Sequence, residues 1–256
     1  MHYGICNLSI VALRAFANHT SEMISQVLFG ETFEILETDK SWSKIKLSFD
    51  NFEGYINNKQ FIDISENKFL QLQSSKSVFS SDILGMITNE KNEFFTIPFG
   101  ATLPFFEKNQ LKLGTNTFTY DSEIISNKFD KDEILHTAYS YLNSPYLWGG
   151  RTHFGIDCSG FTQMVYKLCG YQIPRNAHEQ ANCGEVLSFI EESEAGDLAF
   201  FDNEEGEIIH VGIILNDYHI IHAHGKVRID SLDHSGIFNA DLQKHTHKLR
   251  VIKKLI

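Results

Sequence analysis

The sequence has little positive charge. Its 256 residues include 22 Lys and Arg against 33 Asp and Glu, which gives a formal net charge of −11 with His counted neutral. Proteins that bind nucleic acid or an anionic membrane surface use a surplus of basic side chains to neutralise phosphate groups. The composition therefore predicts neither a nucleic-acid partner nor a membrane partner.

Cysteine is scarce and long apolar runs are missing. The four cysteines include no Cys-x-x-Cys pair, so we expect neither a disulfide scaffold nor a thiolate zinc site. No apolar run approaches the ~20 residues of a membrane-spanning helix. Residues 8–17 are moderately apolar and 15–17 resemble a signal cleavage site, but the first residues carry no Lys or Arg. We expect a cytoplasmic protein rather than a secreted one.

The first half of the chain is typical of β structure. Short segments alternate apolar and polar residues between Gly, Asn and Asp, which predicts the antiparallel strands of a small barrel. These segments are residues 26–31, 33–37, 42–47 and 54–56. Residues 98–105 and 114–120 predict strands of a second, more divergent barrel. An irregular β linker is the alternative for this second region.

The chain changes character near residue 130. Asp130 and Glu133 have the spacing of a capping box, apolar residues follow at helical spacing, and Pro145 ends the helix. A second helix is predicted from Cys158 to near Gly170. Strands are then expected at residues 197–201, 210–215 and 219–222. The second half is therefore predicted to be α first and then β.

Cys158 is the predicted nucleophile. It stands at the expected start of a helix, after the glycine-rich segment 146–150. The unpaired N–H groups and the positive end of the helix dipole favour a thiolate, so we expect a lowered pKa for this thiol. The alternative is a small buried residue, which is the usual role of a free cysteine.

Two histidines are candidates for the base and its partner. If the strands at 210–215 and 219–222 form a hairpin, His210 and His222 approach each other across it. One imidazole can then accept the thiol proton while the other orients it.

The remaining histidines suggest no further chemistry. His219, His222 and His224 are possible metal ligands, but no carboxylate stands at a suitable spacing, so we predict no metal and no cofactor. His245 and His247 are expected to be solvated.

These motifs together resemble a known family. The segments Tyr-x-Trp-Gly-Gly at 146–150 and Asp-Cys-Ser-Gly at 157–160, followed by His-Val-Gly-Ile and Ile-His-Ala, are similar to the NlpC family of bacterial cell-wall cysteine peptidases. The resemblance implies a papain-like α+β catalytic domain preceded by all-β SH3-type barrels. The expected domains are a bacterial SH3-type barrel at 1–62, a divergent second barrel at 63–128 and the peptidase at 129–256.

The resemblance implies roles for the catalytic residues. Cys158 matches the nucleophile, His210 the base and His222 the polar third residue. Tyr146 matches a tyrosine that helps stabilise the oxyanion. His224 stands where a small residue is expected, which leaves open whether His222 or His224 orients His210.

Chains with such barrels resemble γ-D-glutamyl-L-diamino acid endopeptidases, which trim murein peptides. The subgroup uses the residues beside the cysteine, here Asp157 and Ser159, to bind a free N-terminal L-Ala. Its first barrel contributes a Glu and a Tyr, for which Glu22 and Tyr55 are the candidates. The other substrate-binding candidates are Trp148 and Arg175. From the residues alone, Asp157 is equally a helix cap, Arg175 and Glu22 surface charges, and Tyr55 a barrel-core residue.

The expected function is hydrolysis of the bond between γ-D-Glu and a diamino acid in short murein peptides, in cell-wall peptide recycling, by a monomer. The alternatives are a murein amidase or acyl transferase with the same Cys–His chemistry, and a non-catalytic wall-binding protein. Residues 176–225 contain 11 acidic residues and no Lys or Arg. This acidic stretch is either a solvated face or a field that raises histidine pKa values.

Overall fold

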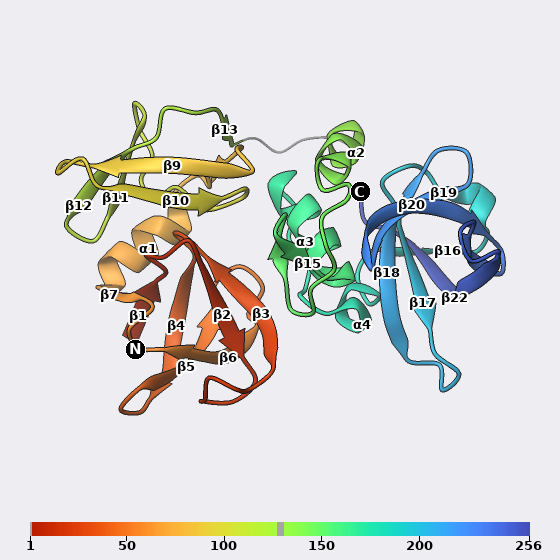
Figure 1. Cartoon of the computed structure of the whole chain (residues 1–256), viewed down its shortest axis with the longest axis horizontal. Coiled ribbons are helices and arrows are strands. Elements are labelled where there is room, and N and C mark those ends of the chain that lie inside the picture. The colour runs from red at the N-terminus through yellow and green to blue at the C-terminus, as the bar shows by residue number, and fades with distance from the viewer. Residues whose placement is uncertain (1, 127–130) are drawn as a thin grey trace. The chain divides into compact units, whose positions relative to one another are not determined.

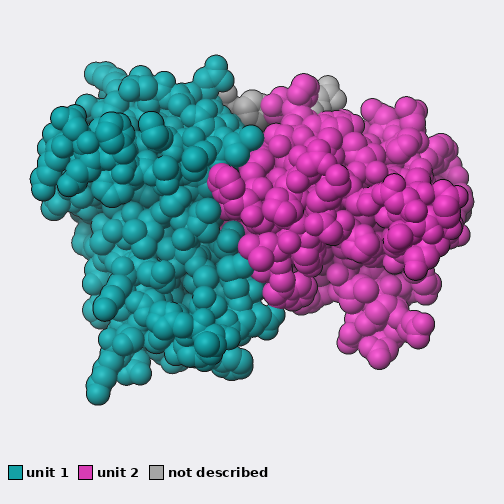
Figure 2. All heavy atoms as spheres, viewed as in Figure 1, with its two compact units in different colours: residues 1–126 teal, residues 127–256 magenta. Residues whose placement is uncertain are grey.

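The chain divides into two compact units, residues 1–126 and 127–256, coloured teal and magenta in Figure 2. The structure is a computed structural model that describes residues 2–126 and 131–256. Asp130, the predicted helix cap, lies outside the described residues. The finer division at residues 62 and 128 stays a prediction. Among the described helices, none is both long enough and apolar enough to cross a membrane.

Unit 1 begins with a seven-stranded antiparallel sheet in the order β3-β2-β6-β5-β4-β1-β7 (Figure 1). Its strands are β1 (His2–Ile5), β2 (Ile10–Arg14), β3 (Met23–Leu28), β4 (Thr32–Thr38), β5 (Trp42–Leu47), β6 (Glu53–Asn57) and β7 (Ile62–Ile64). Alternate residues of β5 point into a core that includes Leu13, Phe33 and Ile45, each fully buried. The prediction of an N-terminal SH3-type barrel is confirmed.

The rest of unit 1 adds a helix and two smaller sheets. A four-stranded sheet has the order β10-β9-β12-β11, and β13 pairs with β8. The elements are α1 (Glu66–Ser74), β8 (Phe79–Ser80), β9 (Leu84–Asn89), β10 (Phe94–Pro98), β11 (Gln110–Leu113), β12 (Asn116–Thr119) and β13 (Ile124–Ile125). The predicted strand at 114–120 is confirmed by β12.

The predicted strand at 98–105 is wrong. β10 ends at Pro98 and the chain turns at Phe99 and Gly100, where Gly100 has a φ of 75°. Thr102 makes only an isolated bridge to Phe79. Proline cannot donate to a strand ladder and the positive φ suits glycine, so this apolar segment forms a turn.

Unit 2 has its helices first and its main sheet second, as predicted. The helices are α2 (Lys131–Ser140), α3 (Cys158–Leu168), α4 (Ala177–Gln180) and the 3-10 turn η1 (Ile190–Glu192). The short strands β14 (Arg151–Thr152) and β15 (Gly155–Ile156) pair before α3. The main strands are β16 (Glu185–Leu187), β17 (Leu198–Asp202), β18 (Ile208–Leu215), β19 (His219–His224), β20 (Lys226–Asp233), β21 (Gly236–Asn239) and β22 (Lys244–Lys254).

Strands β17 to β22 form a closed antiparallel barrel. Each strand from β17 to β21 pairs with the next, and the long strand β22 pairs with both β21 and β17. Apolar side chains fill its core, among them Phe201, Ile220 and Ile237. Helix α3 packs against β18 and β19 and is buried along its whole length. The start of α3 is therefore held against the strands that carry the two candidate histidines.

Candidate active site

Cys158 is the first residue of α3, and Asp157 caps this helix. The Asp157 side chain accepts hydrogen bonds from the backbone N–H of Gly160 at 2.6 Å and of Gly149 at 2.8 Å. The carboxylate thus ties the first turn of α3 to the glycine-rich loop before it. A Cβ on Gly160 would lie 2.3 Å from the carbonyl oxygen of Gly150, so glycine is required for this close approach.

Arg175 is buried and pairs with Asp157. Its Nη2 lies 2.6 Å from Asp157 Oδ2 and its Nη1 lies 3.0 Å from Asp157 Oδ1, while Nη1 also donates to Ser159 Oγ at 2.9 Å. Arg175 is only 2% exposed, so it is not a surface charge. Buried Gln180 donates to the carbonyl of Ser159. The predicted contacts of Asp157, Ser159 and Arg175 with substrate stay predictions, and the observed contacts fix the nucleophile's helix.

Burial governs the acidity of the nucleophile. It raises the pKa of Cys158 to about 12, and nearby Asp157 adds to the rise. A hydrogen bond from the Val211 backbone, the charge of Arg175 and the Ser159 backbone act in the opposite direction. The prediction of a lowered pKa is therefore wrong, because desolvation outweighs the backbone hydrogen bonds and the charge of Arg175. The thiol is neutral and needs a base.

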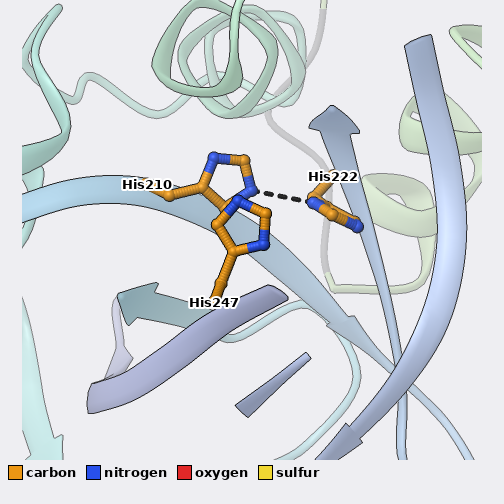
Figure 3. A group of neighbouring side chains, drawn as sticks. All are labelled: His210, His222 and His247. Carbon is orange, nitrogen blue, oxygen red and sulfur yellow. Dashed lines mark hydrogen bonds between the residues drawn. The ribbon is translucent and has the colours of Figure 1, made fainter. Parts of the chain in front are cut away.

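His210 and His222 meet on one face of the β18–β19 hairpin, as predicted. His222 stands opposite Gly212, so His210 is its diagonal neighbour. A Cβ on Gly212 would lie 2.9 Å from His222 Cβ, which explains the glycine between the two ring positions. His210 Nε2 lies 2.8 Å from His222 Nδ1 (Figure 3). The orienting residue is therefore His222 and not His224.

Asp230 completes the chain behind the base. Its Oδ2 lies 3.0 Å from His222 Nε2, and Arg228 holds the same carboxylate through two hydrogen bonds at 2.7 and 2.8 Å. Sequence reasoning missed Asp230, although His222 and Arg228 are register partners on β19 and β20. The sequence signal for Asp230 is the Arg-x-Asp alternation on β20, which places the side chains of Arg228 and Asp230 on one face of that strand.

These contacts determine where the protons lie. An ionised carboxylate only accepts, so His222 Nε2 carries the proton that bonds to Asp230. His222 Nδ1 is then an acceptor for His210 Nε2–H. His210 is left with a free lone pair on Nδ1, as a general base requires. Burial lowers the pKa of His210 well below its usual value, so the imidazole is neutral.

His247 joins the two histidines from β22, where sequence reasoning expected a solvated side chain. Its ring stacks on that of His210 with centroids 4.2 Å apart, and one of its nitrogens points toward the His210–His222 pair (Figure 3). Burial lowers the pKa of His247 to about 4. It also lowers the pKa of His222, which Asp230 raises in part. The pKa values of His210 and His222 are lowered, so the alternative in which the acidic stretch raises histidine pKa values is wrong.

Tyr146 lies near the nucleophile. Burial, then the charges of Cys158 and Asp157, raise its pKa to about 12, so it stays a neutral hydrogen-bond donor. The residue as a whole remains 37% exposed. Trp148 is 60% exposed on the same loop.

Glu22 and Tyr55 belong to unit 1. Glu22 is exposed between β2 and β3, and Tyr55 is half-buried on β6 beside Arg14. Their predicted role in binding substrate stays a prediction.

Comparison with known proteins identifies the family. Residues 143–248 match the NlpC/P60 family, and residues 13–61 match the bacterial dipeptidyl-peptidase Sh3 domain. The γ-D-glutamyl-L-lysine dipeptidyl-peptidase of Bacillus subtilis is 30% identical over 213 residues, which are 78% of this chain and 71% of that protein. The chain belongs to the NlpC/P60 family. It is a cysteine peptidase with Cys158 as the predicted nucleophile.

Two further proteins match most or all of the chain. The γ-D-glutamyl-L-lysine dipeptidyl-peptidase of Bacillus cereus is 26% identical and covers 82% of this chain and 70% of that protein. The crystal structure of an NlpC/P60 family protein from Bacillus cereus superposes with a TM-score of 0.82 at 19% identity, over 99% of both chains. At this identity the superposition establishes the fold alone.

Replacing Asp230 by Asn should lower kcat by about 100-fold or more and leave KM little changed. The amide can present N–H to His222 and reverse the tautomer that the base needs. Steady-state kinetics with murein tripeptides measures both constants. The matched control is Asp233→Asn on the same strand, whose carboxylate contacts His245 instead. Wild-type kcat in Asp230→Asn would contradict the assignment.

Replacing Tyr146 by Phe should lower kcat by about 100-fold, the usual cost of losing one oxyanion donor. KM should change little because the donor acts on charge that develops only during reaction. Tyr139→Phe, at a 47% exposed tyrosine of α2, is the control that should retain full activity. An active Tyr146→Phe enzyme would exclude the hydroxyl from catalysis.

Replacing Arg175 by Met should destabilise unit 2 by about 3–5 kcal/mol, because Asp157 would stay buried without its partner. Urea unfolding, followed by Trp148 fluorescence in a Trp42→Phe background, measures the loss. The control is Arg250→Gln, since Arg250 is 61% exposed and its nearest carboxylate is 3.7 Å away. We expect less than about 1 kcal/mol for this control. Equal effects of the two changes would refute the structural role of Arg175.

Proposed function

We propose that this enzyme hydrolyses the bond between the γ-carboxyl of D-Glu and a diamino acid in short murein peptides that begin with a free L-Ala. The observation that carries the proposal is the buried chain from His210 through His222 to Asp230, on strands of the barrel against which the Cys158 helix packs. The named activity of relatives with the same barrel-and-peptidase layout supports the substrate.

The first step is attack by a neutral thiol. As Cys158 Sγ bonds to the γ-carbonyl carbon, its proton passes to His210 Nδ1. His222 and Asp230 stabilise the imidazolium that forms, since Asp230 holds the only full negative charge bonded to His222 in the described part of the chain. Proton transfer that accompanies attack suits a thiol whose pKa burial has raised.

The second step releases the diamino acid. Tyr146 and the Cys158 backbone N–H donate to the oxyanion of the tetrahedral intermediate. His210 returns its proton to the leaving amine, and a thioester to Cys158 remains. Water, deprotonated by His210, then attacks the thioester and frees the dipeptide L-Ala-D-Glu together with the thiol.

Product analysis by mass spectrometry tests the proposal. The substrates are L-Ala-γ-D-Glu-L-Lys, its meso-diaminopimelate analogue, and each peptide with an acetylated N-terminus. We expect L-Ala-D-Glu and free diamino acid from the two peptides with a free N-terminus. The two acetylated peptides should be cleaved at least about 10-fold more slowly, and Cys158→Ala should give no product.

The alternatives give different products. An amidase releases the sugar from a muropeptide, and an acyl transferase yields a new amide in the presence of an added amine. A non-catalytic wall-binding protein leaves all peptides intact and sediments with sacculi. Turnover undiminished in Cys158→Ala would contradict the proposed chemistry altogether.

We further propose that the enzyme acts as a cytoplasmic monomer on imported peptides. The requirement for a free N-terminal amine restricts it to peptides already detached from sugar, which fits recycling. Fractionation of cells that produce the protein, with size-exclusion light scattering of the purified chain, tests this part. A protein recovered from the medium or the wall would refute the cytoplasmic location.

A further inference from the structure

The catalytic histidines form part of a larger cluster. One ring nitrogen each of His210, His222 and His247 lies within 4.8 Å of the other two (Figure 3). The rings come from three strands, β18, β19 and β22, that belong to one closed barrel. We infer that these three histidines bind one divalent transition-metal ion, of the zinc class, and that the bound ion inhibits the enzyme.

The distances suit a small ion. Zinc binds imidazole nitrogen at about 2.0–2.1 Å in a tetrahedral arrangement, which places neighbouring ligand nitrogens about 3.4 Å apart. The 2.8 Å between His210 Nε2 and His222 Nδ1 must widen by about half an ångström. Rotation of the two rings about their side-chain torsions can supply this change.

Two of the three ligands already have the supports that metal-binding histidines need. Asp230 accepts from His222 Nε2, which directs the lone pair of Nδ1 inward. Thr246 Oγ1 lies 2.9 Å from His247 Nδ1 and can donate its own proton to the Ile237 carbonyl. With Nδ1–H bonded to Thr246, His247 presents Nε2 as an unprotonated ligand.

The ligand set also selects the kind of ion. Three neutral imidazoles suit zinc, copper and nickel, whereas calcium and magnesium prefer oxygen ligands. The cluster can be reached from outside, because His247 is partly exposed and His224, whose ring lies 4.9 Å from it, is exposed. Water can then complete the tetrahedron.

Inhibition follows from the lone pairs that the ion uses. In the catalytic tautomer His210 carries its proton on Nε2 and accepts on Nδ1. Coordination through Nε2 moves that proton to Nδ1, so no site remains to receive the thiol proton. No proton leaves the protein in this exchange. The inference departs from the sequence-based prediction of no metal, because His247 lies 25 residues beyond His222 in the chain and 37 beyond His210.

Direct binding tests the site without any substrate. Calorimetric titration of the full-length Cys158→Ala variant with zinc chloride should show one ion per chain. His247→Gln in the same background should weaken binding by more than about 10-fold, since even the loss of a ligand's support costs 10–100-fold. The matched control is His245→Gln, which removes a histidine of the same strand outside the cluster and should bind zinc unchanged.

Several outcomes would overturn the inference. Absence of binding at 100-fold molar excess, loss of binding in Cys158→Ala relative to wild type, or equal binding by the His247 and His245 variants would each exclude the three-histidine site.

The second measurement is inhibition of peptide cleavage by zinc, which rests on the proposed substrate. We expect that a chelator reverses the inhibition and that magnesium does not cause it. Inhibition of His247→Gln should need more than about 10-fold more zinc than inhibition of the wild type, with the rate of each variant compared with its own metal-free rate. Binding without inhibition would refute the inhibitory role alone. Failure of all peptides to be cleaved would refute the proposed function and leave the binding result standing.

Discussion

One buried carboxylate, that of Asp157, connects the segments that position the nucleophile. Asp157 receives two backbone N–H groups and a bidentate guanidinium from Arg175, so it joins the glycine loop, the first turn of α3 and the segment before α4. A charge buried to this degree is stable only while its partners stay in place. The position of Cys158, one residue further on, therefore depends on an ion pair that takes no part in the proposed chemistry.

The base, His210, depends on a second buried carboxylate, that of Asp230. Asp230 sets the tautomer of His222, and His222 sets the tautomer of His210. Both effects act over single hydrogen bonds between buried side chains, where the loss of one partner is costly. The thiol contributes little by its own acidity, because burial raises its pKa. Reactivity in this site therefore comes from the orientation of the thiol and its base and not from a preformed thiolate.

Much of this could be predicted from the sequence. Alternation predicted the strands of the first barrel, and motif spacing predicted Cys158, His210 and their partner His222. Local patterns could not show His247, because barrel closure brings β22 beside β17, which is distant in the chain. Asp230 lies on β20, next to the strand of His222, and its contact with His222 depends on the pairing register of these two strands. The burial of His247 has the same cause: its ring stacks on His210 because β22 pairs with β17, and these strands are far apart in the sequence. The strand predicted at 98–105 is wrong for a local reason. The apolar residues of this segment are typical of a strand, but the chain turns at Phe99 and Gly100.

Closure of the barrel also has a consequence for biosynthesis. Strands β17 and β21 each keep an unpaired edge until β22 is present, since β22 pairs with both. A nascent chain of 243 residues already holds the nucleophile, the base and its carboxylate, yet it lacks the strand that closes the barrel. The barrel that carries His210 and His222 therefore cannot close until β22, the last strand of the described chain, has been translated.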